Sequence, residues 1–268
     1  MKSKRELPPL SNAMHKAAGV ISQKGNRLTL TLAWMLWMLS AMLCFFLNEV
    51  LSALTWLARA AMGWWLAPVA EELIRLCLWG AVTLFLLLPL LHGILGLSRD
   101  MMQGEVVPLA DLFRPFSARW SYAGCLSSSF ALTWRGMLTV LVVRGTYGTF
   151  QALFSGKLLG GILCAILILG ELFLGFWLCV RVFPRFYFAV RDERMPGWEA
   201  MEEAVALRRA FPTGGFRFFF GFLPRVLLGC CTMGLWLLAD TLPMMCLTYV
   251  TDCEMMNEIR DIEEKDHE

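Results

Sequence analysis

Three charged side chains interrupt long apolar stretches of the chain: Arg135, Glu171 and Arg225. A charge at the centre of a bilayer costs about 2.5–3.5 kcal/mol on insertion scales, so such a residue normally faces other helices and finds a partner. At about 1.5 Å per helical residue, we expect Glu171 to lie closer in depth to Arg225 than to Arg135, with one carboxylate bridging both. This candidate charge network would relay an ion or substrate, or would fix the register of the helices; we favour the structural role. Alternatively, Arg225 reaches the membrane surface without a partner.

The other reactive residue types form no catalytic, cofactor-binding or metal-binding constellation. His92 has no second His or Cys at metal-ligand spacing and is interpreted as a hydrogen-bonded core residue. Seven of the nine cysteines lie in apolar stretches and none forms a CxxC pair, so we interpret them as packing residues. The serines at 127–129 lack a neighbouring His or Asp and are expected to pack between helices. Residues 155–158, Ser-Gly-Lys-Leu, miss the Ser or Thr that a phosphate loop requires after lysine. We therefore expect no enzyme and no cofactor.

Composition indicates the class of element that must position these residues. The chain of 268 residues is 57% hydrophobic and only 17% charged, with a mean hydropathy of +0.58. Soluble domains carry about 25% charged residues, so the composition excludes a soluble enzyme, a disordered chain and a fibrous protein. The net charge of +2 gives no support to nucleic-acid binding.

Five apolar runs reach the length of about 20 residues that a helix needs to cross the hydrocarbon core. They lie at about 28–47, 76–97, 120–143, 158–180 and 218–239. Each is continuously apolar, whereas the strands of a membrane barrel alternate apolar and polar residues. We therefore predict an all-α, polytopic transmembrane helical bundle over residues 28–250, with Pro89 kinking the second span.

Residues 51–68 decide the topology. They hold one arginine and end near a Gly-Trp-Trp cluster, so we expect an amphipathic helix on the outer interface, anchored by Trp56, Trp64 and Trp65. With the N-terminus in the cytoplasm, this arrangement puts 16 Lys and Arg in cytoplasmic segments and 4 in outer loops. The positive-inside rule requires such a bias. The alternative is a sixth span, which would place the Arg-rich loop after residue 180 outside.

Two polar segments flank the bundle. Residues 1–27 are predicted to form a basic cytoplasmic arm that acts as a topology signal or, alternatively, touches anionic lipid. Residues 251–268 are predicted to form an acidic tail, a solvated helix end that frays, and five spans would place this tail outside. Asp240 is expected at the outer end of the fifth span.

Two loops carry further helices. Residues 109–113 are expected to form one short helical turn between prolines. Residues 198–211 predict a cytoplasmic amphipathic helix, because early glutamates and late arginines suit the helix dipole. Its apolar stripe would be Met201, Ala204, Val205 and Leu207.

Several short motifs follow one another along the chain in a recognisable order. They are Gly104, Asp111-Leu112-Phe113, Tyr187, the acidic-to-basic segment 199–209 and Gly214-Gly215. In this order they resemble a family of bacterial integral membrane proteins of unknown function, which is similar to the membrane domain that precedes some glycerophosphodiester phosphodiesterases. The resemblance covers about half of the chain, carries no agreed activity and implies the bacterial cytoplasmic membrane. A Pro-Tyr pair usual in the family is here Pro243-Met244, and the usual helix serine before the basic pair is absent.

Two functions remain open. The first is a non-enzymatic accessory or interaction protein of the bacterial envelope, with membrane lipids and a membrane protein as partners; small loops and the lack of a cofactor motif favour it. The alternative is a small transporter or lipid-handling protein that uses Arg135, Glu171 and Arg225. The sequence shows no inverted repeat and one Pro-broken span with flanking glycine, whereas many secondary transporters have paired broken helices.

Overall fold

The computed structural model is helical throughout the part of the chain that it describes. Described are residues 9–23, 25–62, 68–117, 119–154, 158–192, 195, 197–232, 234 and 236–265, and these ranges contain no strand. Five helices in them are long and apolar enough to cross a membrane: Asn26–Leu54, Ile74–Met102, Gly124–Gln151, Gly160–Arg191 and Gly214–Cys231. The predicted helical bundle with five candidate spans is therefore confirmed.

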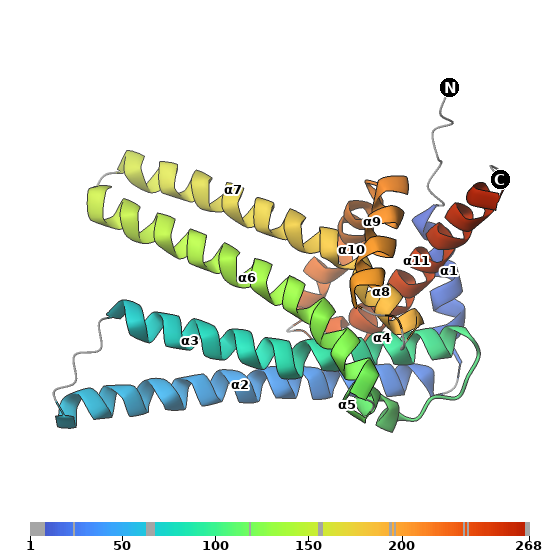
Figure 1. Cartoon of the computed structure of the whole chain (residues 1–268), viewed down its shortest axis with the longest axis horizontal. Helices are drawn as coiled ribbons and strands as arrows, with labels where there is room; N and C mark the ends of the chain where they lie inside the picture. Colours follow the sequence, from blue (N-terminus) through green and yellow to red (C-terminus); the bar gives the residue numbers. More distant parts are fainter. Residues whose placement is uncertain are drawn as a thin grey trace.

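Two long helical hairpins extend from a compact group of helices (Figure 1). The first hairpin pairs α2 (Asn26–Met62) with α3 (Pro68–Val82), which continues through the π-helix η1 (Thr83–Leu87) into α4 (Leu88–Met102). The second hairpin pairs α6 (Arg119–Phe154) with α7 (Leu158–Val182). The tips of both hairpins lie at one end of the molecule, which we call the hairpin end, and the hairpins diverge toward it (Figure 1).

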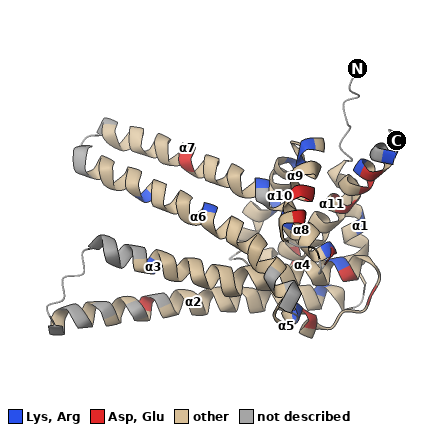
Figure 2. Cartoon of the chain, viewed as in Figure 1, with Lys and Arg blue, Asp and Glu red and all other residues tan. Residues whose placement is uncertain are grey.

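The remaining helices pack around α4 at the opposite end, which we call the core end. They are α1 (Leu10–Ile21), α5 (Arg114–Ser117), α8 (Pro184–Arg191), α9 (Gly197–Ala210), α10 (Gly214–Cys231), α11 (Leu242–Lys265), the 3₁₀-helix η2 (Leu109–Phe113) and the π-helix η3 (Leu237–Thr241). The largest fully buried side chains lie mainly here, whereas the hairpins expose many large apolar side chains. Figure 2 shows the same division, because charged residues gather at the core end.

The predicted interfacial helix at 51–68 is not a separate element. Residues 51–62 continue α2, which runs unbroken for 37 residues. No Gly or Pro occurs between Leu28 and Met62, so nothing in the sequence ends the helix there. Trp56 is exposed, and Trp64 and Trp65 lie outside the described residues.

The acidic segment is helical, as expected, but over residues 251–265 it is not a solvated, fraying end; residues 266–268 lie outside the described part of the chain. The helix α11 continues to Lys265, and Asp252, Asn257 and Arg260 are all at least nine-tenths buried. Its acidic composition hid this role, because the charges are neutralised by tertiary partners. Asp252 pairs with Arg217 of α10, and Arg260 pairs with Glu203 of α9 at 2.7 Å.

The predicted N-terminal arm is also more ordered than expected. Residues 10–21 form α1, whose Ala13 and Ala17 are fully buried, and α1 packs against α11. Small side chains spaced four residues apart allow two helices to approach closely. The basic residues Lys2, Lys4 and Arg5 lie outside the described part of the chain.

Asp240 lies at the core end and not at the far end of a crossing. Arg27, at the beginning of α2, donates to the Ala239 carbonyl at 3.1 Å and to Asp240 at 3.3 Å. The π-helix η3 is thus close to the beginning of α2. The helix α11 contacts α1 and α9, so it lies beside the first described helix at the core end; the side of the membrane on which the tail lies stays a prediction.

Two π-helical turns share one sequence pattern. η1 and η3 each lead directly into a Leu-Pro pair, Leu88-Pro89 and Leu242-Pro243. Proline lacks an N–H and its ring clashes with the carbonyl four residues earlier, so the preceding turn widens. Each proline is followed, at the same spacing, by an acidic residue and two methionines, 100–102 and 254–256. The segments η1–α4 and η3–α11 therefore share one design, and α10 contains a further proline, Pro224, inside the helix.

The short helices in the loops match the sequence analysis. η2 occupies the predicted turn at 109–113, and α9 occupies the predicted helix at 198–211 to within one residue at each end. The buried face of α9 consists of Ala200, Ala204 and Leu207, whereas Met201 of the predicted stripe is 45% exposed.

Candidate functional site

The structure does not bring Arg135, Glu171 and Arg225 together. In the second hairpin, Thr139 of α6 packs against Gly175 of α7, where an added Cβ would lie 2.3 Å from Thr139 Cγ2. Arg135 and Glu171 each precede this contact by four residues on antiparallel helices, so they lie about 12 Å apart along the hairpin. No ion pair joins the three residues in the part of the chain that the structure describes, and the charge network stays a prediction.

The three residues of the predicted network differ in their contacts and in their burial. Glu171 accepts a 2.5 Å hydrogen bond from Thr146 Oγ1, and Arg135 Nη1 is buried without a hydrogen-bond partner among the described residues. Arg225 is exposed on α10, with its guanidinium 5.7 Å from the centre of the Phe222 ring. The depths predicted from the sequence were counted from the ends of the helices. These ends are not level, because α6 begins well beyond the point along the hairpin at which α7 ends.

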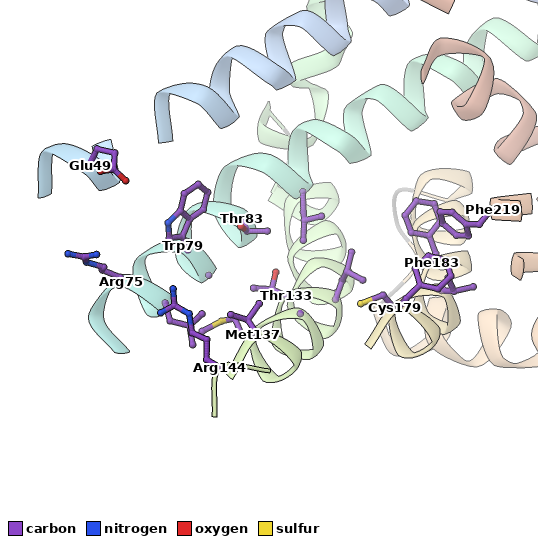
Figure 3. Close-up of a pocket in the computed structure, with 18 residues that line it drawn as sticks. Glu49, Arg75, Trp79, Thr83, Thr133, Met137, Arg144, Cys179, Phe183 and Phe219 are labelled. Carbon is purple, nitrogen blue, oxygen red and sulfur yellow. The ribbon is translucent and has the colours of Figure 1, made fainter. Parts of the chain in front are cut away.

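A cavity of about 880 Å³ lies between the two hairpins (Figure 3). Its walls come from α3, η1 and α4 on one side and from α6 and α7 on the other, with single residues from α2 and α10. We call this cavity the cleft. Its lining residues are Glu49, Arg75, Leu76, Trp79, Gly80, Thr83, Leu88, Leu132, Thr133, Gly136, Met137, Val140, Arg144, Phe176, Cys179, Val180, Phe183 and Phe219.

The charged lining residues gather at one end of the cleft. Glu49, Arg75 and Arg144 come from α2, α3 and α6, and Figure 3 shows them toward the same side. Arg75 Nη2 donates to Ser52 Oγ at 2.7 Å, which orients its guanidinium between the two helices of the first hairpin. From the sequence alone, Arg75 and Arg144 are two of the four basic residues that were assigned to the outer loops. Their arrangement arises from the packing of helices that are distant in sequence.

The other end of the cleft is aromatic. Phe219 of α10 makes edge-on ring contacts with Phe176 at 5.3 Å and with Phe183 at 5.8 Å. The carbonyl of Phe183 accepts a 2.8 Å hydrogen bond from Tyr249 of α11, so this end is anchored to the core. Aromatic pairs of this geometry prefer fixed orientations. The cleft therefore runs from charged groups to an aromatic, apolar end.

Glycines shape the walls of the cleft. A Cβ at Gly80 of α3 would lie 2.4 Å from Met137 Sδ, so the absence of a side chain lets α6 approach α3 at that point. A Cβ at Gly136 of α6 would meet nothing within 4 Å. Residues 132, 136, 140 and 144 line the cleft at intervals of four, which identifies one face of α6. This spacing is the sequence signal that could have identified that wall.

The remaining sequence-predicted residues have structural positions. His92 is 4% exposed, in agreement with a core position, but its Nδ1 has no hydrogen-bond partner within the described residues. Ser127 accepts a 2.7 Å hydrogen bond from Arg185 Nη2, and Ser128 and Ser129 are buried, as expected for packing between helices. In the described ranges, no three His, Cys, Asp or Glu side chains are placed to hold a metal ion.

Comparisons of the chain with protein-family models, with curated proteins and with solved structures each returned no match. The cleft is therefore interpreted from its own geometry.

Proposed function

We propose that this multi-pass membrane protein is a lipid-handling protein whose cleft binds an amphiphile with an anionic headgroup. The observation that carries the proposal is the division of the cleft into a charged end, with Arg75 and Arg144, and an aromatic end, with Phe183 and Phe219. A guanidinium binds phosphate or carboxylate through a planar fork of donors, and an apolar cavity binds hydrocarbon.

The size and position of the cleft support this class of ligand. Ligand pockets typically enclose about 300–1,000 Å³, and the cleft encloses about 880 Å³. It lies between two hairpins whose helices expose large apolar side chains, as surfaces in contact with lipid do. A hydrophobic ligand would therefore enter from the bilayer and not from water.

A pair of glycine variants tests the proposal. Gly136→Leu places a side chain into the open cleft, whereas Gly148→Leu makes the same change on an exposed part of α6, where a Cβ also meets nothing within 4 Å. Native mass spectrometry of the protein, extracted gently from its membrane, would show co-purifying lipid. We expect lipid on the wild type and on Gly148→Leu, and its loss from Gly136→Leu at an unchanged melting temperature.

The charged end is tested separately. Arg144→Gln is expected to reduce the preference for anionic over zwitterionic lipid about tenfold, the magnitude of one charge-assisted hydrogen bond. Equal lipid occupancy in the wild type and Gly136→Leu would contradict the proposal.

The accessory-protein interpretation stays a prediction and gives a different spectrum. A stoichiometric protein partner together with a lipid-free cleft would favour it. The resemblance to a bacterial membrane family, and with it a location in the bacterial cytoplasmic membrane with a cytoplasmic N-terminus, also remain predictions.

A further inference from the structure

A second cavity, of about 220 Å³, lies at the core end, where α7 and α9 end and α10 begins. Val180 is the one lining residue that this cavity shares with the cleft. The lining residues are Trp177, Val180, Arg181, Pro184, Leu207, Arg208, Arg209, Phe211, Pro212, Gly214, Gly215, Phe216 and Met256.

Three arginines converge on this cavity. Arg181 lies in the last turn of α7, and Arg208 and Arg209 lie in the last turn of α9. Arg181 stacks on Trp177 with its guanidinium 3.2 Å from the ring centre, and it is close enough to Arg208 for the two charges to repel. Within the described part of the chain, no carboxylate pairs with any of the three. The cluster thus has an excess of positive charge that an anion would neutralise.

The beginning of α10 adds backbone donors to the same cavity. Thr213 occupies the N-cap position but makes no side-chain capping hydrogen bond. The first-turn N–H groups of Gly215 and Phe216 have no partner inside the helix, and the helix dipole favours negative charge at this end. Gly214 is buried, and a Cβ on Gly215 would lie 2.7 Å from Val180 Cγ1, so α10 begins in close contact with α7. Arginines facing a helix N-terminus form a recurrent type of phosphate site.

An apolar surface leads away from the cavity along α7 and α10. Phe216 lies within ring-contact distance of Phe176, at 6.3 Å, and of Phe220, at 6.5 Å. Phe220 and Phe173 are 58% and 60% exposed. Both helices are long and apolar enough to cross a membrane, so the apolar surface beside the cavity suits acyl chains.

We propose that this cavity is a phosphate site, which takes the phosphate headgroup of a membrane phospholipid or free phosphate. The site is distinct from the cleft, and the proposal does not rest on the proposed function. Basic pockets between the ends of transmembrane helices are known to bind lipid headgroups in this way.

A charge-matched pair of double variants tests the site. Arg181→Gln/Arg208→Gln removes two arginines of the cavity, and Arg191→Gln/Arg225→Gln removes two exposed arginines elsewhere at the core end. The probes are phosphatidylglycerol and phosphatidylcholine, added to the delipidated protein in detergent and counted by native mass spectrometry. Inorganic phosphate, without lipid, is the third probe, read from the melting temperature. The Gly136→Leu variant separates this site from the cleft.

We expect the wild type to bind phosphatidylglycerol about tenfold more tightly at this site than phosphatidylcholine, as charge-assisted hydrogen bonds to a phosphate imply. The cavity variant should lose this preference and one bound lipid, while the control variant and Gly136→Leu keep this site occupied. An arginine-dependent rise in melting temperature with phosphate alone, without lipid preference, would support the site and identify free phosphate as its source. No headgroup preference and no phosphate effect in the wild type, or equal losses in both double variants, would overturn the proposal.

Discussion

Glu171 lies within an apolar helix, and its only hydrogen bond among the described residues comes from Thr146 on the neighbouring helix of the hairpin. Asp252 and Arg185 also have partners on other elements. Asp252 forms an ion pair with Arg217, and Arg185 donates a hydrogen bond to Ser127. These three groups thus have partners on neighbouring elements, whereas Arg135 Nη1 and His92 Nδ1 have no hydrogen-bond partner among the described residues. The hydrogen bond from Thr146 gives Glu171 a local partner that needs no long-range charge network.

A double-mutant cycle checks this at Glu171. Combining Glu171→Gln with Thr146→Val should show a coupling energy of about 1 kcal/mol, because the two side chains share a hydrogen bond. Combining Glu171→Gln with Arg225→Gln should be additive in the free energy of unfolding, measured in detergent. A coupling between Glu171 and Arg225 would restore the charge network that the sequence suggested.

The buried carboxyl of Asp252 predicts a pH dependence of stability. Burial raises the pKa of Asp252, and the nearby Arg217 only partly offsets that effect. Between the ordinary carboxyl pKa of about 4 and the raised value, the folded state binds the proton more readily than the unfolded state. The melting temperature of the wild type should therefore rise relative to that of Asp252→Asn as the pH falls from neutrality through this window. A constant difference between the melting temperatures of the wild type and Asp252→Asn from pH 7 to pH 4.5 would argue against a raised pKa of Asp252.

At the scale of elements, one close approach holds the loop helix η2 against α4. A Cβ on Gly93 would lie 2.1 Å from the carbonyl oxygen of Leu112, which is backbone and cannot rotate away. Leu112 itself is fully buried. The position therefore requires glycine for space and not for backbone conformation.

Two alanine substitutions on α4 separate these effects. Gly93→Ala should destabilise the protein by about 1–3 kcal/mol, because η2 must move to admit the methyl group. Gly96→Ala is the control, since a Cβ there meets nothing within 4 Å and alanine favours a helix. Thermal unfolding in detergent compares the two, and similar melting temperatures would show that η2 does not pack on α4 as described.

The elements differ in how well the sequence predicts them. Apolar runs of 20 residues predicted α2, α3–α4, α6, α7 and α10, because hydropathy alone decides whether a helix can lie in lipid. The length of α2 was not predicted, because residues 51–68 were expected to form a separate helix on the membrane surface. No helix-breaking residue separates them from the preceding helix. The role of α11 was missed for a different reason. Charged residues along a helix suggest that the helix faces solvent. In α11, however, Asp252 and Arg260 pair with Arg217 and Glu203, and the sequence does not show these pairings.

At the scale of the whole molecule, burial is divided unequally. The core end encloses the fully buried aromatic residues, whereas in the hairpins α3 approaches α6 closely at Gly80 and Met137. The hairpins diverge toward their tips (Figure 1), and the cleft lies between them on both sides of this close approach. No local pattern specifies this divergence. The sequence could therefore predict that residues of α6 at intervals of four share one face. It could not predict that a cavity lies beside that face.

The packing of α1 against α11 has a consequence for how the protein is made. These are the first and the last helices of the described chain, and each fills the surface that the other leaves open. During synthesis the hairpins can enter the membrane one after another, while the core end stays unfinished until α11 leaves the ribosome. Until then α1, α4 and α9 expose the apolar faces that α11 later covers. The nascent chain therefore stays open to proteases and to aggregation at this end until α11 has been made.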